Sequence, residues 1–249
     1  MMTKIKKIQD DRMSDQLRAT QAANPNSSLF GLEALPDSAA ARNIILSDRD
    51  VSRFIDASYG RDRKLGLLVH VLAESGARPS QATRLLVEDL HGRAKARLSV
   101  PRSAKGGSKN RGARKHERVN VPIPPALAAK MKLAAKGRPG DAPLLLQADG
   151  QPWGDRPSDD YREDIAEIVQ GLGLGSETTL YALRHSSIVR QLLRGVPIRI
   201  IAATHDTSVA AIEKHYSKYI ADHSDDLSRA ALLDHKPPGG DNIVSIAGR

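Results

Sequence analysis

Residues 180–220 read LYALRHSSIVRQLLRGVPIRIIAATHDTSVAAIEKHYSKYI, and apolar side chains recur in this segment at helical spacing. They form two blocks, Leu180 to Leu192 and Val209 to Tyr219, and each block places its apolar residues on one face of a helix. Asp206 or Thr207 can cap the second block, because a short oxygen-bearing side chain satisfies free N–H groups at a helix start. We therefore predict helices over 178–194, 197–203 and 207–220.

Three polar side chains in this segment are candidates for a functional site. Arg184 lies at the edge of the apolar face, where a half-buried guanidinium needs a carboxylate, a carbonyl or a phosphate. Taken alone, that position also fits a structural salt bridge. Tyr216 lies on the apolar face of the last helix, and periodicity alone favours a core tyrosine with a hydrogen-bonded hydroxyl. His205 stands just before that helix, whereas His215 points to another face, towards solvent.

The chain before this segment contains further helix signals. Ser47 to Asp50 resembles a capping box, and residues 62–74 contain a buried apolar face. Gly76 is predicted to end the second of these helices. Pro79 is predicted to begin a third helix, which includes Ala82, Leu85 and Leu86.

Arg78 stands directly before Pro79, in a predicted turn between two helices. The residue before a proline avoids the helical conformation, so its guanidinium should lie near the N-terminus of the next helix. Free N–H groups there favour an anion. A surface arginine without a ligand is an equal alternative on local grounds.

Residues 91–118 are strongly basic, with ten Lys or Arg residues and a single acid, Glu117. Segments 97–100 and 119–123 alternate apolar and polar residues, which predicts a β-hairpin whose strands are joined by a long basic loop. Lys105 lies near the predicted turn. Five further basic residues are candidates for contacts with the phosphates of a nucleic acid, and contact with water alone is the alternative: Arg102, Lys109, Arg111, Arg114 and Lys115.

The remaining helices are predicted over 124–136, 158–170 and 224–233, separated by proline- and glycine-containing breaks. The predicted fold is therefore mixed, mainly α-helical with one small antiparallel β-sheet. Residues 1–42 are polar and interrupted by prolines, which predicts an arm or linker. Residues 43–221 should form the main domain, and residues 222–249 a C-terminal helix with a flexible tail.

Composition fits a polyanionic partner, nucleic acid before membrane, and fits a merely solvated basic surface about equally well. Lys and Arg exceed Asp and Glu by 38 to 29, a formal charge of +9, and aromatic residues make up only 3%. A basic protein with few aromatic side chains suits duplex DNA better than stacked single strands. The chain has no cysteine, which excludes disulfides, cysteine-ligated zinc and a thiol nucleophile, and which fits a cytoplasmic location. No apolar run is long enough for a membrane span, and the scattered histidines predict neither a metal site nor a cofactor.

The order of these pieces is more informative than any one of them. An arginine in a Gly-x-Arg turn is followed by a hairpin lysine, a helical Arg-His pair, a histidine and a tyrosine. This order resembles the catalytic domain of the tyrosine recombinase (phage integrase) family over about residues 43–221. The similarity is strongest in Leu183-Arg184-His185, Gly195-Val196-Pro197, His205-Asp206-Thr207-Ser208 and Ile212-Glu-Lys-His-Tyr216.

The resemblance implies a catalytic-domain fold and a role for each matching residue. Arg78 and Arg184 correspond to the phosphate-binding arginines, Lys105 to the hairpin lysine and His205 to the downstream histidine. Tyr216 corresponds to the nucleophile, although Tyr219 lies one helical turn further on and remains an alternative.

The sequence departs from the family pattern at two positions. Tyr181 stands where the family usually has the histidine that precedes the second arginine by three residues, and a phenol is a poorer base near neutral pH. Tyr181 would instead orient the phosphate or a water molecule. Gln81 stands where the family usually has an acid, so it cannot supply charge next to Arg78.

The resemblance implies a metal-independent recombinase or integrase that cuts and rejoins double-stranded DNA through a 3′-phosphotyrosine, acting as a tetramer. Residues 1–42 would then be the remnant of the helical domain that precedes the catalytic domain in this family, or the chain would be a fragment. The alternative is a non-catalytic or decayed integrase that binds double-stranded DNA through its basic surface.

Overall fold

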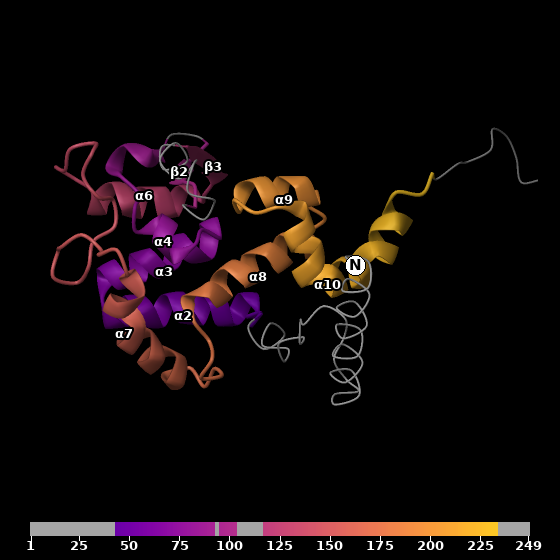
Figure 1. Cartoon of the computed structure of the whole chain (residues 1–249), viewed down its shortest axis with the longest axis horizontal. Coiled ribbons are helices and arrows are strands. Elements are labelled where there is room, and N and C mark those ends of the chain that lie inside the picture. Colours follow the sequence, from indigo (N-terminus) through magenta and orange to yellow (C-terminus); the bar gives the residue numbers. More distant parts are fainter. Residues whose placement is uncertain (1–42, 93–94, 104–116, 234–249) are drawn as a thin grey trace, which may run out of the picture. The chain divides into compact units, whose positions relative to one another are not determined.

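The computed structural model describes residues 43–92, 95–103 and 117–233 (Figure 1). The chain divides into two units, residues 1–42 and 43–249, and all the described residues belong to the second. The predicted N-terminal arm and the tail from residue 234 lie outside the described residues. The described part is mainly helical with one three-stranded antiparallel sheet, which confirms the predicted fold class.

The first two helices begin close to where the sequence predicts, and the second ends at the predicted Gly76. Helix α2 spans Asp48–Arg61 and α3 spans Arg63–Ser75. The Ser47 hydroxyl accepts a hydrogen bond from the Asp50 amide at 3.1 Å, as expected for the N-terminal residue of a capping box. Helix α3 ends at Gly76 in the left-handed conformation (φ 61°), which glycine adopts at little cost.

The predicted hairpin is also present. Strand β2 (Arg97–Pro101) pairs antiparallel with β3 (Arg118–Pro122), with Leu98 opposite Val121 and both side chains buried. A short strand, β1 (Leu90–His91), pairs with the other edge of β2, so the order is β1-β2-β3. The sequence did not predict β1, because two residues are too few to show an alternating pattern.

The helix predicted from Pro79 is shorter than expected. Helix α4 spans only Pro79–Ala82 and is followed by a 3₁₀ turn, η2 (Val87–Asp89). Leu85 is fully buried, and its carbonyl accepts a hydrogen bond from the Leu144 amide at 2.7 Å. Backbone pairing with a distant segment therefore replaces the last predicted helical turn, which a local pattern could not show.

The second half of the described chain contains α6 (Pro125–Ala134), α7 (Pro157–Gly171), α8 (Leu180–Leu193), α9 (Ile198–Thr204) and α10 (Val209–Ala230). The prediction of separate helices over 207–220 and 224–233 was wrong, because α10 continues through both segments. The predicted cap at Asp206 or Thr207 was also wrong. The Ser208 hydroxyl accepts from the Ala211 amide at 3.1 Å, and this leaves Asp206 available for other contacts.

Helix α8 joins two parts of the core. Its first turns, including Leu180 and Leu183, pack in a cluster with α2, α3, α6, α7 and the sheet. Its later turns, including Ile188 and Val189, pack with α9 and the start of α10. Arg184 and His185 therefore lie on a helix that is held on both sides, between the two clusters (Figure 1).

Candidate active site

Two arginines that are 106 positions apart meet at the turn between α9 and α10. Arg78 Nη1 donates to the carbonyl of Asp206 at 3.1 Å, and Arg184 Nη2 donates to the carbonyl of His205. Arg184 Nη1 also donates to the carbonyl of Gly76 at 2.8 Å. Successive carbonyls of one turn thus orient both guanidinium groups, and the two predicted arginines are brought together.

The positive charge of Arg184 has neutral partners only. Its side chain is 4% exposed, and within the described part of the chain no carboxylate lies at ion-pair distance from it. Burial, and then the charge of Arg78, lowers the pKa of Arg184 to about 10, so the guanidinium remains charged at neutral pH. A buried cation held by carbonyls alone attracts an anion more strongly than one paired with an acid.

His205 lies beneath this turn and is almost completely buried. Its Nδ1 faces the carbonyl of Ile201 at 3.0 Å and its Nε2 faces the Ser187 hydroxyl at 3.1 Å. Because a carbonyl can only accept, Nδ1 carries the proton and Nε2 accepts from Ser187. Burial, and then the nearby charge of Arg184, lowers the pKa of His205 to about 3, so the ring is neutral.

Gly76 makes this arrangement possible. A Cβ atom at this position would lie 2.3 Å from Nε2 of His205 and 2.9 Å from the Ser187 hydroxyl. The left-handed backbone and the close approach of the ring both require glycine here. The Gly-x-Arg pattern therefore places His205 next to the backbone that leads into Arg78.

Tyr216 extends from α10 towards α8 and is 5% exposed. Its hydroxyl forms a short hydrogen bond with Nδ1 of His185. Burial raises the pKa of Tyr216 to about 12, and the positive charge of Arg184 opposes this effect. The hydroxyl of the predicted nucleophile therefore contacts the residue that follows one of the predicted arginines on α8. Tyr219 is only half-buried, with its ring under the Lys218 ammonium at 4.8 Å.

His185 is a site residue for which the sequence predicted no role. It follows Arg184 and lies one helical turn after Tyr181, whose ring centroid is 5.3 Å from that of His185. Burial, and then the charge of Arg184, lowers the pKa of His185 to about 4. The i, i+4 spacing of Tyr181 and His185 was the available signal, but the partner on α10 is visible only in three dimensions. Tyr181 itself is 37% exposed at the edge of the site.

Asp206 is the second residue that the sequence analysis missed. Its backbone has a positive φ of 47°, a conformation that aspartate tolerates better than most residues. One carboxylate oxygen accepts from the Ser103 amide at 2.7 Å and lies 3.4 Å from Arg78 Nη1. The other accepts from Arg102 at 3.2 Å. Asp206 therefore connects the turn to Arg78 and to the end of β2.

Gln81 completes this network and is 1% exposed. Its Nε2 donates to the carbonyl of Pro101 at 2.8 Å and to the Asp206 carboxylate at 3.1 Å, while its Oε1 accepts from the Arg78 amide at 3.0 Å. The amide is needed because it donates and accepts at the same place. Asp206 supplies the negative charge next to Arg78 that Gln81 cannot provide.

No family model matches the chain, and no curated protein matches it by sequence. Solved structures do match. The Tn1549 transposon integrase covers 91% of this chain and 80% of its own length at 16% identity, with a TM-score of 0.62. The XerA recombinase covers 76% of this chain at 18% identity (TM-score 0.57). The catalytic domain of bacteriophage HP1 integrase matches over 96% of its own length at 18% identity (TM-score 0.50).

This chain has the tyrosine recombinase catalytic-domain fold. It spans 66% of the XerA chain and 57% of the XerH chain that it matches. The fold agrees with the sequence resemblance and accounts for the order of the pieces, since residues near α4, α8 and the α9–α10 turn meet at one place.

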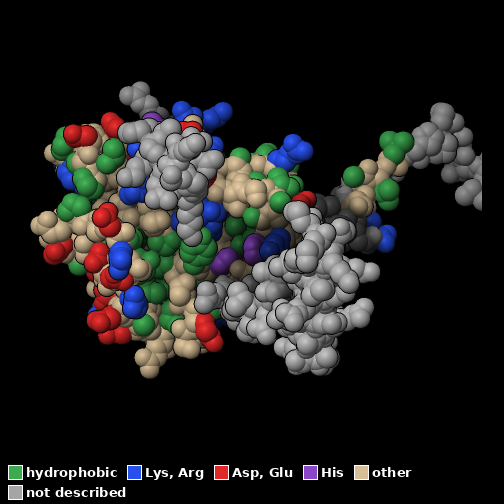
Figure 2. Space-filling view, viewed as in Figure 1, with side chains coloured by type: hydrophobic (Ala, Val, Ile, Leu, Met, Phe, Trp, Pro, Cys, Tyr) green, Lys and Arg blue, Asp and Glu red, His purple; other side chains and the backbone are tan. Residues whose placement is uncertain are grey.

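Five of the predicted site residues belong to the segment 104–116. Lys105, Lys109, Arg111, Arg114 and Lys115 lie outside the described residues. Arg102, at the end of β2, is described: it is exposed and also pairs with Glu117 at 3.0 Å. Figure 2 shows histidine side chains next to basic ones over α8, near the centre of the view.

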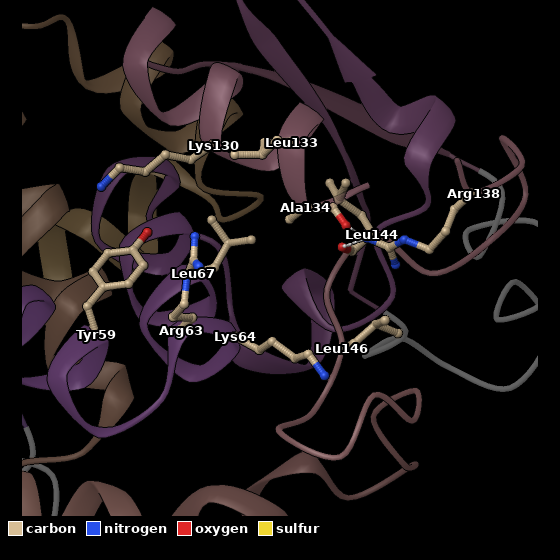
Figure 3. A pocket seen from close by; sticks show the side chains of 10 residues that line it. All are labelled: Tyr59, Arg63, Lys64, Leu67, Lys130, Leu133, Ala134, Arg138, Leu144 and Leu146. Atoms are coloured by element: carbon tan, nitrogen blue, oxygen red, sulfur yellow. Dashed lines mark hydrogen bonds between the residues drawn. The ribbon is translucent and has the colours of Figure 1, made fainter. Parts of the chain in front are cut away.

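A cavity of about 510 Å³ lies elsewhere in the recombinase fold, between the start of α3 and α6 (Figure 3). None of the predicted site residues lines it. Two of its cations are already bonded, Lys64 to the carbonyl of Ala148 at 2.9 Å and Arg138 to the carbonyl of Leu144 at 3.0 Å. The described residues contain no group of three or more His, Asp or Glu able to hold a metal ion. None of the described helices has the length and apolar character that a bilayer crossing requires.

Proposed function

We propose that this chain is a site-specific DNA recombinase or integrase that cleaves and rejoins strands through Tyr216. The proposal rests on one observation: Arg78 and Arg184 bind successive carbonyls of the α9–α10 turn, and the charge of Arg184 acts on the phenol of Tyr216. A phosphodiester is an anion that repels nucleophiles, and two fixed arginines offset this repulsion and stabilise a five-coordinate transition state.

In the proposed reaction the Tyr216 oxygen attacks the phosphorus and the bond from phosphorus to the 5′-oxygen breaks. The leaving oxygen takes the electron pair and a proton, which we assign to Lys105. The 3′-phosphotyrosine keeps the energy of the phosphodiester, so a second 5′-hydroxyl can displace Tyr216 and reseal the strand without a nucleotide. In this proposal Tyr181 faces the bound phosphate, and Arg102 with the basic residues of 104–116 contacts neighbouring phosphates.

The proposed partner is double-stranded DNA. The matched XerH recombinase is bound to its difH substrate, and the matched Tn1549 integrase is in complex with circular intermediate DNA. We propose by analogy that this chain acts on DNA as an oligomer, a tetramer in the family resemblance. Residues 43–221 are proposed as the catalytic domain, preceded by an arm or linker and followed by a C-terminal extension.

Covalent capture tests this function without knowledge of the target site. The protein is incubated with a pool of nicked duplexes of randomised sequence, and DNA that remains attached to protein on a denaturing gel is amplified and sequenced. We expect a band that is absent in Tyr216→Phe and retained in Tyr219→Phe. A band that Tyr219→Phe abolishes and Tyr216→Phe retains would show that Tyr219 is the nucleophile.

A non-catalytic DNA-binding protein is the second candidate. The observation that favours it is the burial of Tyr216, whose hydroxyl already has a partner in His185. DNA binding by the wild type in a gel-shift assay, without any covalent band from the pool, would support this candidate.

A further inference from the structure

The hydrogen bond between His185 and Tyr216 joins two helices at the reacting atom of the proposed function. His185 lies on α8 directly after Arg184, and Tyr216 lies on α10. The two ring centroids are 5.8 Å apart with the planes tilted by 46°. This geometry places an imidazole nitrogen at the phenol oxygen, within the distance over which a proton can transfer.

The direction of this hydrogen bond follows from the protonation states. His185 is neutral at neutral pH, since burial, Arg184 on its own helix and His215 on α10 all lower its pKa. The Tyr216 pKa of about 12 keeps the phenol protonated. The phenol therefore donates and Nδ1 accepts, so the ring proton of His185 is on Nε2.

The other groups in the site are less suitable as proton acceptors. Both ring nitrogens of His205 are engaged, with the Ile201 carbonyl and the Ser187 hydroxyl. Tyr181 is a phenol itself, and it lies at the exposed edge of the site. Asp206 directs its carboxylate to Arg78 and Arg102.

We propose, building on the function proposed above, that His185 is the catalytic base that takes the proton of Tyr216 as the phenol attacks the DNA phosphate. The O–H bond of Tyr216 breaks as its oxygen binds phosphorus, and Nδ1 of His185 receives the proton. The resulting imidazolium returns the proton to the Tyr216 oxygen when a 5′-hydroxyl displaces it during rejoining. The bound phosphate is the anion that makes this transfer favourable, because its charge opposes the effect of Arg184 on the imidazole.

The rate of covalent capture as a function of pH tests the proposal. With DNA recovered from the randomised pool, His185→Gln should slow capture by about 10²-fold or more near neutral pH, the usual contribution of a general base. Its rate should also rise with pH more steeply than that of the wild type, because the phenol must then ionise without a base. His215→Gln is the matched control: it removes an exposed imidazole next to Tyr216 but keeps the hydrogen bond between His185 and Tyr216, so it should slow capture far less than His185→Gln does.

Nitrogen NMR of the free protein provides a second readout that requires no DNA. With ¹⁵N-labelled histidine, we expect His185 to be protonated on Nε2 and its Nδ1 signal to shift in Tyr216→Phe. A proton on Nδ1, or a His185→Gln variant with wild-type rate and pH profile, overturns the role of His185. A wild type that captures no DNA refutes the proposed function itself, and this step with it, whatever the NMR result.

Discussion

Replacing Gln81 by glutamate should destabilise the protein, although an acid is the usual residue at this position in the family that the sequence resembles. The amide nitrogen of Gln81 donates to the Pro101 carbonyl at 2.8 Å and to the Asp206 carboxylate at 3.1 Å. A glutamate would turn a second oxygen towards both acceptors, in a site where the side chain is 1% exposed. The variant therefore loses two hydrogen bonds and brings a buried carboxylate against another one.

The size of the effect follows from these contacts. Each lost buried hydrogen bond costs about 1 kcal/mol, and an uncompensated buried charge costs about 3–5 kcal/mol. Arg78, whose Nη1 lies 3.4 Å from Oε1 of Gln81, offsets part of the charge term. We expect Gln81→Glu to lower the free energy of unfolding by about 3 kcal/mol at pH 7. Gln81→Met removes these two hydrogen bonds and also the one that Oε1 accepts from the Arg78 amide, without adding a charge, and should cost about 3 kcal/mol.

The pH dependence separates the two variants. Burial raises the pKa of the introduced carboxyl above its unfolded value, so the folded state binds more protons and stability falls as pH rises. The deficit of Gln81→Glu relative to the wild type should therefore shrink between pH 7 and pH 5, while that of Gln81→Met stays constant. Urea unfolding followed by the fluorescence of Trp153, the single tryptophan, measures both. A Gln81→Glu variant as stable as the wild type at pH 7, or with the same deficit at pH 5, would refute this description of the Gln81 contacts.

Four further changes test other parts of the site. Gly76→Ala should cost about 2–4 kcal/mol of unfolding free energy, because the added Cβ would strike the ring of His205 and because residue 76 has a positive φ. Gly60→Ala is the control: there is open space around Gly60, so this change should be neutral or stabilising. Because the pKa of His205 is lowered in the folded protein, the unfolded state binds more protons between about pH 6.5 and pH 3. Stability is therefore lost as the pH falls through this window. His205→Gln should make this loss smaller, as measured by urea unfolding at a series of acid pH values. Arg184→Lys should abolish covalent capture with little change in far-UV circular dichroism. An ammonium cannot bridge the carbonyls of Gly76 and His205 in the geometry of the guanidinium fork. Capture at the wild-type rate would contradict the role of Arg184. Reversal of three charges within residues 104–116, at Arg111, Arg114 and Lys115, should flatten the salt dependence of DNA affinity by about one unit of log–log slope per lost contact, and an unchanged slope would mean that these side chains do not bind phosphate.

Local patterns were sufficient for most of the helices and for the hairpin. The capping residue Ser47, the left-handed stop at Gly76 and the alternation in β2 and β3 act over a few residues, so they can be read without a partner segment. The patterns were insufficient where distant chain segments decide the conformation. Leu85 leaves the predicted helix to pair with Leu144, and α10 continues through the predicted break.

The amino-acid sequence alone predicted the fold class, because the periodicity of apolar residues distinguishes helices from strands. It predicted the candidate residues Arg78, Arg184, His205 and Tyr216 through the order of motifs that resembles the tyrosine recombinase family. Only the folded molecule decided how these groups are held. The carbonyls of the α9–α10 turn orient the arginines, Asp206 supplies the charge that Gln81 lacks, and His185 meets the phenol of Tyr216. Each of these contacts joins residues more than 20 positions apart, and a hydrogen bond across such a separation depends on packing that no local pattern records.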